Sequence, residues 1–145
     1  MTLLFERIVV GTDGSPTAAV AVNRAIEVAG TNRSELHVVS SQRPIAVNVG
    51  AANQPFGMES QLVSTDIDAP GALADAASMA ATAGIKVECH VRDGDPVAAI
   101  LAVASEVLAD LIVVGSVGIE RRVFGSVPRG ITQRASCDVL IVHTS

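Results

Sequence analysis

The run Leu111-Ile112-Val113-Val114, ended abruptly by Gly115, constrains the fold of this chain most strongly. Four consecutive apolar residues rich in valine and isoleucine indicate a strand that is buried on both faces. Such strands belong to parallel sheets, because the connections between parallel strands cover the sheet with helices. The run therefore predicts an α/β fold with this strand at the centre of the sheet.

The segment after this strand is a glycine-punctuated loop that leads into a helix. It begins with Gly115-Ser116-Val117-Gly118, continues through the six residues 119–124 and closes on Gly125-Ser126-Val127. Ser126 is suited to cap the helix, and Pro128 suits its first turn. Glycine lets the backbone approach an anion, and the first amides of a helix have no partner inside the helix. The segment is therefore typical of a phosphate site.

The beginning of the chain has a similar arrangement. Residues 7–10 predict a short strand that ends at Gly11, and the loop Thr12-Asp13-Gly14-Ser15 follows. The serine of this loop is suited to cap a helix over residues 16–29, where apolar positions recur at helical spacing. Gly30 is expected to end this helix.

The rest of the chain alternates between strand and helix patterns. Strict alternation of apolar and polar residues over 85–92 predicts a strand with one wet face, which belongs at an edge of the sheet. Gly84 is expected to end the helix before it, and Asp95 to cap the helix after it. Residues 42–70 show no helical period and predict no regular element. The remaining predicted elements are strands over 35–41 and 138–143 and helices over 71–83, 96–108 and 127–135.

This order of elements predicts one domain over residues 1–145. Regular alternation implies an open, doubly wound, Rossmann-like parallel sheet with helices on both faces, joined by right-handed crossovers. Open sheets bind ligands beyond the carboxyl ends of their strands, where the winding direction reverses. If the first and fourth strands are neighbours, the two glycine-ended loops meet at one crevice.

Composition excludes several classes of function. The net charge is −5 and the pI about 5.0, whereas a nucleic-acid binder needs a basic face. There is no Trp or Tyr to stack on bases. No apolar run approaches the roughly 18 residues of a membrane span, and residues 1–7 lack the layout of a signal peptide. We therefore expect a soluble, cytoplasmic protein without a nucleic-acid or membrane partner.

Residues that usually hold metals are sparse. Cys89 and Cys137 lie far apart, which favours core packing over a redox pair or a metal site. His37, His90 and His143 each fall in or beside a strand-like run, which favours strand-edge or core positions over ligation. We therefore expect no metal site.

Motifs of catalysis are also missing from the sequence. Lys86 is the single lysine and follows Ile85, so the Gly-Lys-Ser/Thr of the NTPase phosphate loop is absent. Gly11-Thr12-Asp13-Gly14 lacks the spacing of a dinucleotide fingerprint, and there is no nucleophile elbow. We therefore expect no catalytic residues and a binding and signalling module, with slow ATP hydrolysis as a weaker alternative.

Four segments of the sequence form one recognisable pattern: Ile8-Val9-Val10-Gly11-Thr12-Asp13-Gly14-Ser15, Asp110-Leu111-Ile112-Val113-Val114-Gly115-Ser116-Val117-Gly118, Gly125-Ser126-Val127-Pro128 and Cys137-Asp138-Val139-Leu140-Ile141-Val142. Together they resemble the universal stress proteins, specifically their ATP-binding branch. The resemblance covers nearly the whole chain and implies a five-stranded parallel sheet in the order 3-2-1-4-5. It also implies bound ATP, with or without Mg²⁺, and a homodimer that pairs along the last strand from Val139 to Val142.

One spacing departs from the ATP-binding members of that family. The stretch between Gly118 and Gly125 is six residues long, which is shorter than theirs by nearly one helical turn of about 3.6 residues. The position of a triphosphate would change with this loss. AMP, ADP and cyclic AMP are therefore alternative ligands, and a nucleotide-free dimer that acts through protein partners is an alternative function.

Each candidate site residue has a second interpretation without a ligand. Ser126 donates to a phosphate or only caps the last helix. Arg121 and Arg122 reach phosphate oxygens or are simply solvated. The resemblance places Asp13 on the adenine and ribose side, whereas its alternative role is to stabilise a turn.

The two glycines of the second loop shape it and admit the ribose and phosphates, unless they only make tight turns. The resemblance also implies a backbone contact to adenine at the end of the second strand. The candidate nucleotide-binding residues are Gly11, Thr12, Asp13, Gly14, Ser15, Ser40, Ser41, Gly115, Ser116, Gly118, Arg121, Arg122, Gly125, Ser126 and Val127.

Overall fold

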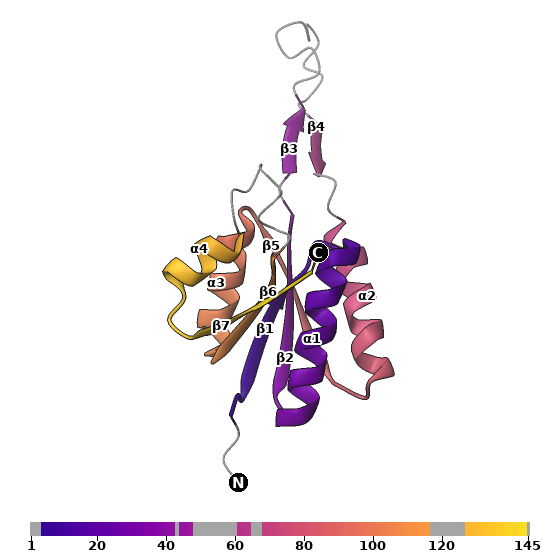
Figure 1. The fold of residues 1–145 in the computed structure, drawn as a ribbon. Helices are drawn as coiled ribbons and strands as arrows, with labels where there is room; N and C mark the ends of the chain where they lie inside the picture. Colours follow the sequence, from indigo (N-terminus) through magenta and orange to yellow (C-terminus); the bar gives the residue numbers. More distant parts are fainter. Residues whose placement is uncertain (1–3, 43, 48–60, 65–67, 117–126, 145) are drawn as a thin grey trace, which may run out of the picture.

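The computed structural model describes residues 4–42, 44–47, 61–64, 68–116 and 127–144. Its centre is a five-stranded sheet in the order β5-β2-β1-β6-β7, with every neighbouring pair parallel (Figure 1). When only these five strands are numbered along the chain, the order is 3-2-1-4-5, so the predicted α/β sheet is confirmed. The strands are β1 (Arg7–Gly11), β2 (Glu35–Gln42), β5 (Val87–Asp93), β6 (Leu111–Gly115) and β7 (Asp138–Val142).

Two helices cover each face of this sheet, so the molecule has three layers (Figure 1). One core lies between the sheet and α1 with α2, and the other between the sheet and α3 with α4. Alternate residues of each inner strand enter opposite cores, as the pleat of a strand requires. The helices are α1 (Pro16–Asn32), α2 (Ala69–Thr82), α3 (Pro96–Val107) and α4 (Val127–Arg134).

Strand β6 is buried on both faces, as its unbroken apolar run predicts. Leu111 and Val113 pack in the core beneath α1 and α2. Ile112 and Val114 pack in the core beneath α3 and α4. Because neither face meets water, the strand carries no alternation of polar residues.

Local capping signals decide where several helices begin and end. The Oγ of Ser15 accepts a hydrogen bond from the amide of Ala18, which confirms the predicted start of α1. Asp95 caps α3 in the same way, through the amide of Ala98. Gly84 follows α2 with φ at +74°, a left-handed conformation that suits glycine just after a helix end.

The predicted end of α1 at Gly30 is wrong. The helix continues to Asn32, and Arg33 closes it in the left-handed conformation with φ at 56°. The amide of Arg33 reaches back to the carbonyl of Ala29, which satisfies one of the last carbonyls of the helix. Packing of α1 on the sheet outweighs the weak helix propensity of Gly30.

Residues 42–70 are more ordered than the sequence predicts. Strands β3 (Pro44–Val47) and β4 (Gln61–Ser64) pair antiparallel and stand beyond the carboxyl ends of the main sheet (Figure 1). Helix α2 also begins two residues before the predicted start, because Asp68 caps it through the amide of Gly71. Residues 42–70 therefore contain an antiparallel strand pair and a helix cap, although their sequence shows no helical period.

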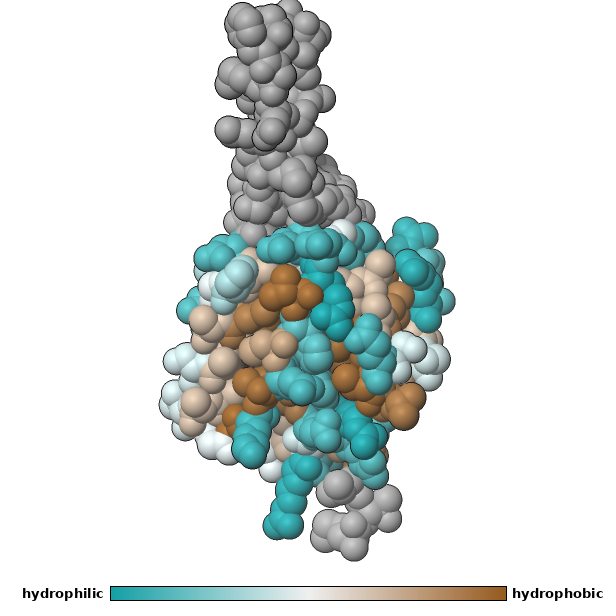
Figure 2. Space-filling view, turned by 180° about the vertical axis from the view of Figure 1, so that it is seen from behind, coloured by the Kyte–Doolittle hydropathy of each residue, from teal (hydrophilic) through white to brown (hydrophobic). Residues whose placement is uncertain are grey.

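Strand β5 lies at the edge of the sheet, as its alternation predicts. The view from behind shows a band of hydrophilic side chains with hydrophobic groups on either side of it (Figure 2). Cys89 of this strand is exposed rather than in the core, and its Sγ lies 3.9 Å from the carbonyl oxygen of Leu73. Core packing was therefore the wrong expectation for this cysteine.

Within the described ranges, no helix is both long enough and apolar enough to cross a membrane.

Candidate functional site

The carboxyl ends of β1, β2 and β6 lie together at one edge of the sheet. Strands β1 and β6 are neighbours, with Val10 opposite Val113. Gly11 and Gly115 therefore leave the sheet side by side, and Ser40 and Ser41 of β2 complete the same edge. Tertiary structure thus brings together two glycine-ended strands that are about a hundred residues apart in the chain.

Close packing under this edge favours both glycines. A Cβ atom at Gly11 would lie 2.6 Å from Cδ1 of Ile100 in α3. A Cβ atom at Gly115 would lie 3.1 Å from Cγ2 of Thr144 and 3.6 Å from Cβ of Ala21 in α1. These glycines therefore have a packing role that is independent of any ligand, because a side chain would force Ile100 or Thr144 to shift.

The first loop is held by hydrogen bonds of its own. The Oγ1 of Thr12 accepts from the amide of Gly14 at 3.1 Å, and Oδ1 of Asp13 accepts from the amide of Ser15 at 2.9 Å. The amide of Thr12 donates to the carbonyl of Val39 at 2.9 Å. The loop is therefore preorganised, but these three amides already have partners and are not open to a phosphate.

Asp13 consequently has the turn-stabilising role that the sequence left as an alternative. An aspartate that accepts a bond from the amide two residues onward forms an Asx-turn. Gly14 has φ at +81°, and a Cβ atom there would lie 3.1 Å from Cβ of Ala72. The first turn of α2 therefore packs directly against this loop, a neighbour that the sequence pattern did not indicate.

Ser40 carries the one unusual polar atom of this edge. Its side chain is buried, and among the described residues its Oγ has no hydrogen-bond partner. Leaving a buried hydroxyl unpaired costs about 1–3 kcal/mol, so such atoms usually bond to water or a ligand. Ser41 is also buried and lies on the opposite face of β2.

The second loop lies mostly outside the described residues, including Gly118, Arg121, Arg122, Gly125 and the predicted cap Ser126. Ser116 is described, and its Oγ accepts a hydrogen bond from the amide of Thr144 at 3.1 Å. Thr144 is a residue that the sequence analysis missed. The signal for it was its position two residues after the last strand, whose final residue Val142 lies opposite Gly115 of β6.

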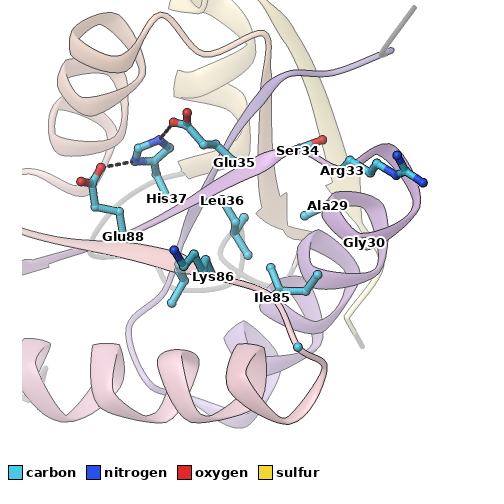
Figure 3. A pocket seen from close by; sticks show the side chains of 12 residues that line it. Ala29, Gly30, Arg33, Ser34, Glu35, Leu36, His37, Ile85, Lys86 and Glu88 are labelled. Atoms are coloured by element: carbon cyan, nitrogen blue, oxygen red, sulfur yellow. Dashed lines mark hydrogen bonds and ion pairs between the residues drawn. The ribbon is translucent and has the colours of Figure 1, made fainter. Parts of the chain in front are cut away.

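A shallow depression lies at the other end of the sheet, by the amino ends of β2 and β5 (Figure 3). Arg33, Glu35 and His37 line one side of it, and Lys86 and Glu88 line the other. It is separate from the glycine-ended strands, which leave the sheet at the carboxyl edge. The sequence analysis did not predict any site here.

Comparison with known sequences points to one family. The profile of the universal stress protein family matches residues 4–143. The chain is 40% identical over 145 residues to universal stress protein Rv1636 of Mycobacterium tuberculosis strain H37Rv, covering 97% of this chain and 98% of that one. It is 35% identical over 150 residues to putative universal stress protein SSP1056 of Staphylococcus saprophyticus, covering 98% and 86% of the two chains.

Solved structures show the same architecture. A universal stress protein crystallised in complex with cAMP is 34% identical and has a TM-score of 0.72, with 97% of this chain and 98% of that chain covered. The crystal structure of Rv1636 is 36% identical and has a TM-score of 0.58, with 97% of each chain covered. The sheet and its covering helices are therefore common to this chain and both structures.

Proposed function

The chain belongs to the universal stress protein family, and we propose that it binds an adenine nucleotide at the carboxyl edge of β1, β2 and β6. The observation that carries the proposal is the meeting of Gly11 and Gly115 on neighbouring strands beside the unpartnered hydroxyl of Ser40. Ligands of open α/β sheets bind where the winding direction reverses. In this sheet that point lies between β1 and β6, because the chain winds one way from β1 and the other way from β6.

The bound nucleotide is one of ATP, ADP, AMP or cyclic AMP, with Mg²⁺ accompanying the polyphosphates. Three amides of the first loop are occupied, so phosphate contacts fall mainly to the second loop and to the start of α4 at Val127. The cAMP complex of a 34%-identical relative supports a ligand with a single phosphate. We therefore rank cyclic AMP and AMP before ATP. The proposed role is binding without turnover.

Isothermal titration of the purified protein with each of the four nucleotides tests this proposal. We expect one nucleotide per chain, with cyclic AMP or AMP giving the lowest Kd. Mass spectrometry of the denatured protein would reveal a nucleotide carried through purification, which must be removed first. A protein that starts nucleotide-free and gives no heat with any of the four is a nucleotide-free member of the family.

Two substitutions at Asp13 separate its turn role from contact with the ligand. Asn at this position still accepts the amide of Ser15, so Asp13→Asn keeps the turn and removes only the charge. If the carboxylate binds the ribose, Asp13→Asn weakens nucleotide affinity by about 10- to 100-fold at unchanged Tm. Asp13→Ala lowers both affinity and Tm, because it also removes the turn. Titration calorimetry and thermal unfolding measure the two effects.

The exposed Asp75 of α2 provides the matched control, because Asp75→Asn changes the net charge equally. It is expected to leave both affinity and Tm unchanged. If Asp13→Asn and the parent chain bind the nucleotide with equal affinity, Asp13 only stabilises the turn and does not contact the ligand.

We further propose that two copies of the chain associate through β7. This strand forms the free edge of the sheet beside β6, and Ile141 on it is 45% exposed. A free edge with an exposed apolar side chain is a ready surface for another strand. Leu140 faces the core beneath α1 and α2 instead, so it supports the strand from within.

Ile141→Lys is expected to convert the dimer into a folded monomer. The lysine would place a charge in the apolar contact between two edge strands, whereas the core of each chain stays intact. Light scattering coupled to size exclusion measures the mass. Val20→Lys is the control, because Val20 is 42% exposed on α1 and is not part of β7. A dimer that persists in Ile141→Lys contradicts pairing along this strand.

A further inference from the structure

A second group of functional side chains lies on the face of the sheet beneath α3. Strand β2 carries Glu35 and His37, and the edge strand β5 carries Glu88 and His90. His37 lies opposite Glu88 in the register of these parallel strands, and the other two residues are each two positions away. Residues two apart on a strand share a face, so all four side chains meet.

Three of these side chains converge on one point. His37 Nδ1 lies 3.0 Å from His90 Nε2 and 3.0 Å from Glu88 Oε2. The third side of the triangle, from His90 Nε2 to Glu88 Oε2, is 3.7 Å. In a tetrahedral zinc site with bonds of about 2.0–2.2 Å, ligand atoms lie roughly 3.3–3.6 Å apart. The three observed distances lie within about 0.3 Å of this range, so small side-chain movements bring the atoms to one triangular face of such a site.

The fourth side chain orients the most buried ligand. Glu35 Oε1 lies 3.0 Å from His37 Nε2, on the side of the ring away from Glu88 (Figure 3). When Nε2–H donates to Glu35, the lone pair of Nδ1 points at Glu88 and His90. Histidines that bind metals usually donate their other ring N–H to a carboxylate or a carbonyl, which fixes the tautomer. Glu35 is in the position of such a carboxylate, which accepts the ring N–H without binding the metal itself.

The same arrangement is unfavourable without a cation. In the neutral tautomer of His37 whose Nε2–H is bonded to Glu35, Nδ1 of His37 and the carboxylate of Glu88 face each other as two acceptors at 3.0 Å, and either a proton on Nδ1 or a bound metal ion relieves this contact. Arg92, the nearest cation on β5, is held by Glu106 of α3 at 2.7 Å. A bound metal ion would be coordinated by all three side chains at once.

The site is exposed on the side of Glu88. The side chain of His37 is 4% exposed, whereas that of Glu88 is 68% exposed. A metal ion therefore reaches the imidazoles from the sheet edge, past the exposed carboxylate of Glu88. Two imidazole nitrogens and one carboxylate oxygen suit first-row divalent metals such as Zn²⁺ and leave a position for water.

We propose that His37, Glu88 and His90 bind a divalent transition-metal ion, zinc, and that Glu35 positions His37 for this role. The ion joins β5 to β2 and so fastens the edge strand to the sheet. The site lies nearer the amino ends of these strands than Ser40 and Ser41, so it is separate from the proposed nucleotide edge.

Titration of the chelator-treated, nucleotide-free protein with zinc chloride tests the proposal. We expect one zinc ion per chain by isothermal titration, and a higher Tm for the zinc-bound protein because the ion binds only the folded chain. Cobalt(II) in place of zinc is expected to give the visible absorption of a site with nitrogen and oxygen ligands. His90→Gln and Glu88→Gln are expected to weaken zinc binding by about 100-fold or more, because outer partners alone change affinity by about 10–100-fold.

Glu35→Gln tests the positioning role. It leaves all three ligands in place, so we expect about 10- to 100-fold weaker zinc binding with the cobalt spectrum retained. Glu88 and Glu35 are exposed enough that their substitution should not disturb folding, and circular dichroism of the metal-free variants checks this.

Two variants serve as matched controls. His143→Gln removes a histidine outside the cluster, and Cys89→Ser removes the thiol between Glu88 and His90, which lies on the opposite face of β5. Both are expected to bind zinc as the parent chain does. The proposal is overturned if the parent chain binds no zinc, if His90→Gln and Glu88→Gln bind it normally, or if Cys89→Ser abolishes binding.

Discussion

We expect the Ile112→Ala variant to lose about 2–5 kcal/mol of the free energy of unfolding, the range for a large aliphatic side chain removed from a rigid core. Ile112 is 1% exposed and lies between Val9 and Val139 on neighbouring strands. It packs beneath α3 and α4, where the buried Ile131 of α4 belongs to the same core. The substitution removes apolar contacts and leaves a cavity that two layers of secondary structure cannot close. Urea unfolding followed by circular dichroism measures the loss.

Val20→Ala is the control for this experiment. Val20 lies on α1 and is 42% exposed, so the free energy of unfolding of the Val20→Ala variant should stay within about 0.5 kcal/mol of the parent value. A bound nucleotide should stabilise the Ile112→Ala variant by an amount that rises with the logarithm of nucleotide concentration above the Kd, because a ligand of the folded state shifts the equilibrium by mass action. A loss below about 1 kcal/mol for Ile112→Ala would mean that β6 is not the packed centre of the sheet.

The second large effect is expected for Asp110→Ala, with a loss of about 1–3 kcal/mol in the free energy of unfolding. The carboxylate of Asp110 accepts from the amide of Glu6 at 2.8 Å and from the amide of Arg7 at 3.0 Å. The amide of Asp110 also donates to the carbonyl of Arg7 at 2.9 Å. One residue thus joins the start of β6 to the start of β1, and alanine leaves the amides of Glu6 and Arg7 without these acceptors.

Asp110→Asn removes the charge and keeps one of the two acceptors, because only the amide oxygen of asparagine can accept a hydrogen bond. We expect it to lose less than Asp110→Ala. Asp138 offers a matched control at the start of β7, since it is exposed and its carboxylate accepts no hydrogen bond from the described residues. Asp138→Ala should stay within about 0.5 kcal/mol of the parent chain, and an equally stable Asp110→Ala would contradict the proposed link between β1 and β6.

The two proposed sites use different parts of the same strand. Strand β2 carries Ser40 and Ser41 at its carboxyl end and Glu35 with His37 near its amino end. A metal ion that fastens β5 to β2 would steady the strand that supplies Ser40 to the nucleotide edge. Comparing the Kd for cyclic AMP with and without zinc would measure this coupling, which linkage requires to be equal in both directions.

Local sequence signals predicted the elements whose formation depends on neighbouring residues. The apolar run before Gly115 indicated a doubly buried strand, and the alternation of 85–92 indicated an edge strand. Ser15 and Asp95 marked helix starts, because a cap is a bond between residues three positions apart. The single-domain organisation and the roles of the candidate site residues stay predictions.

Signals failed where distant contacts outweighed local preference. Gly30 did not end α1, because the helix continues to pack on the sheet until Arg33 closes it. The hairpin of β3 and β4 joins two segments that lack recognisable periodicity. The first loop followed local chemistry instead, because Asp13 has the turn-stabilising role that the sequence left as an alternative to ligand contact.

The sequence by itself determined the α/β class, the buried centre of the sheet and most helix starts, since these depend on residue periodicity and on bonds within one turn. Only the tertiary structure decided which side chains meet. Glu35-Leu36-His37 and Glu88-Cys89-His90 have the same Glu-x-His pattern, but each reads alone as an ordinary strand. Their register in neighbouring parallel strands sets the three donor atoms within a few ångströms, and register depends on the packing of the whole sheet.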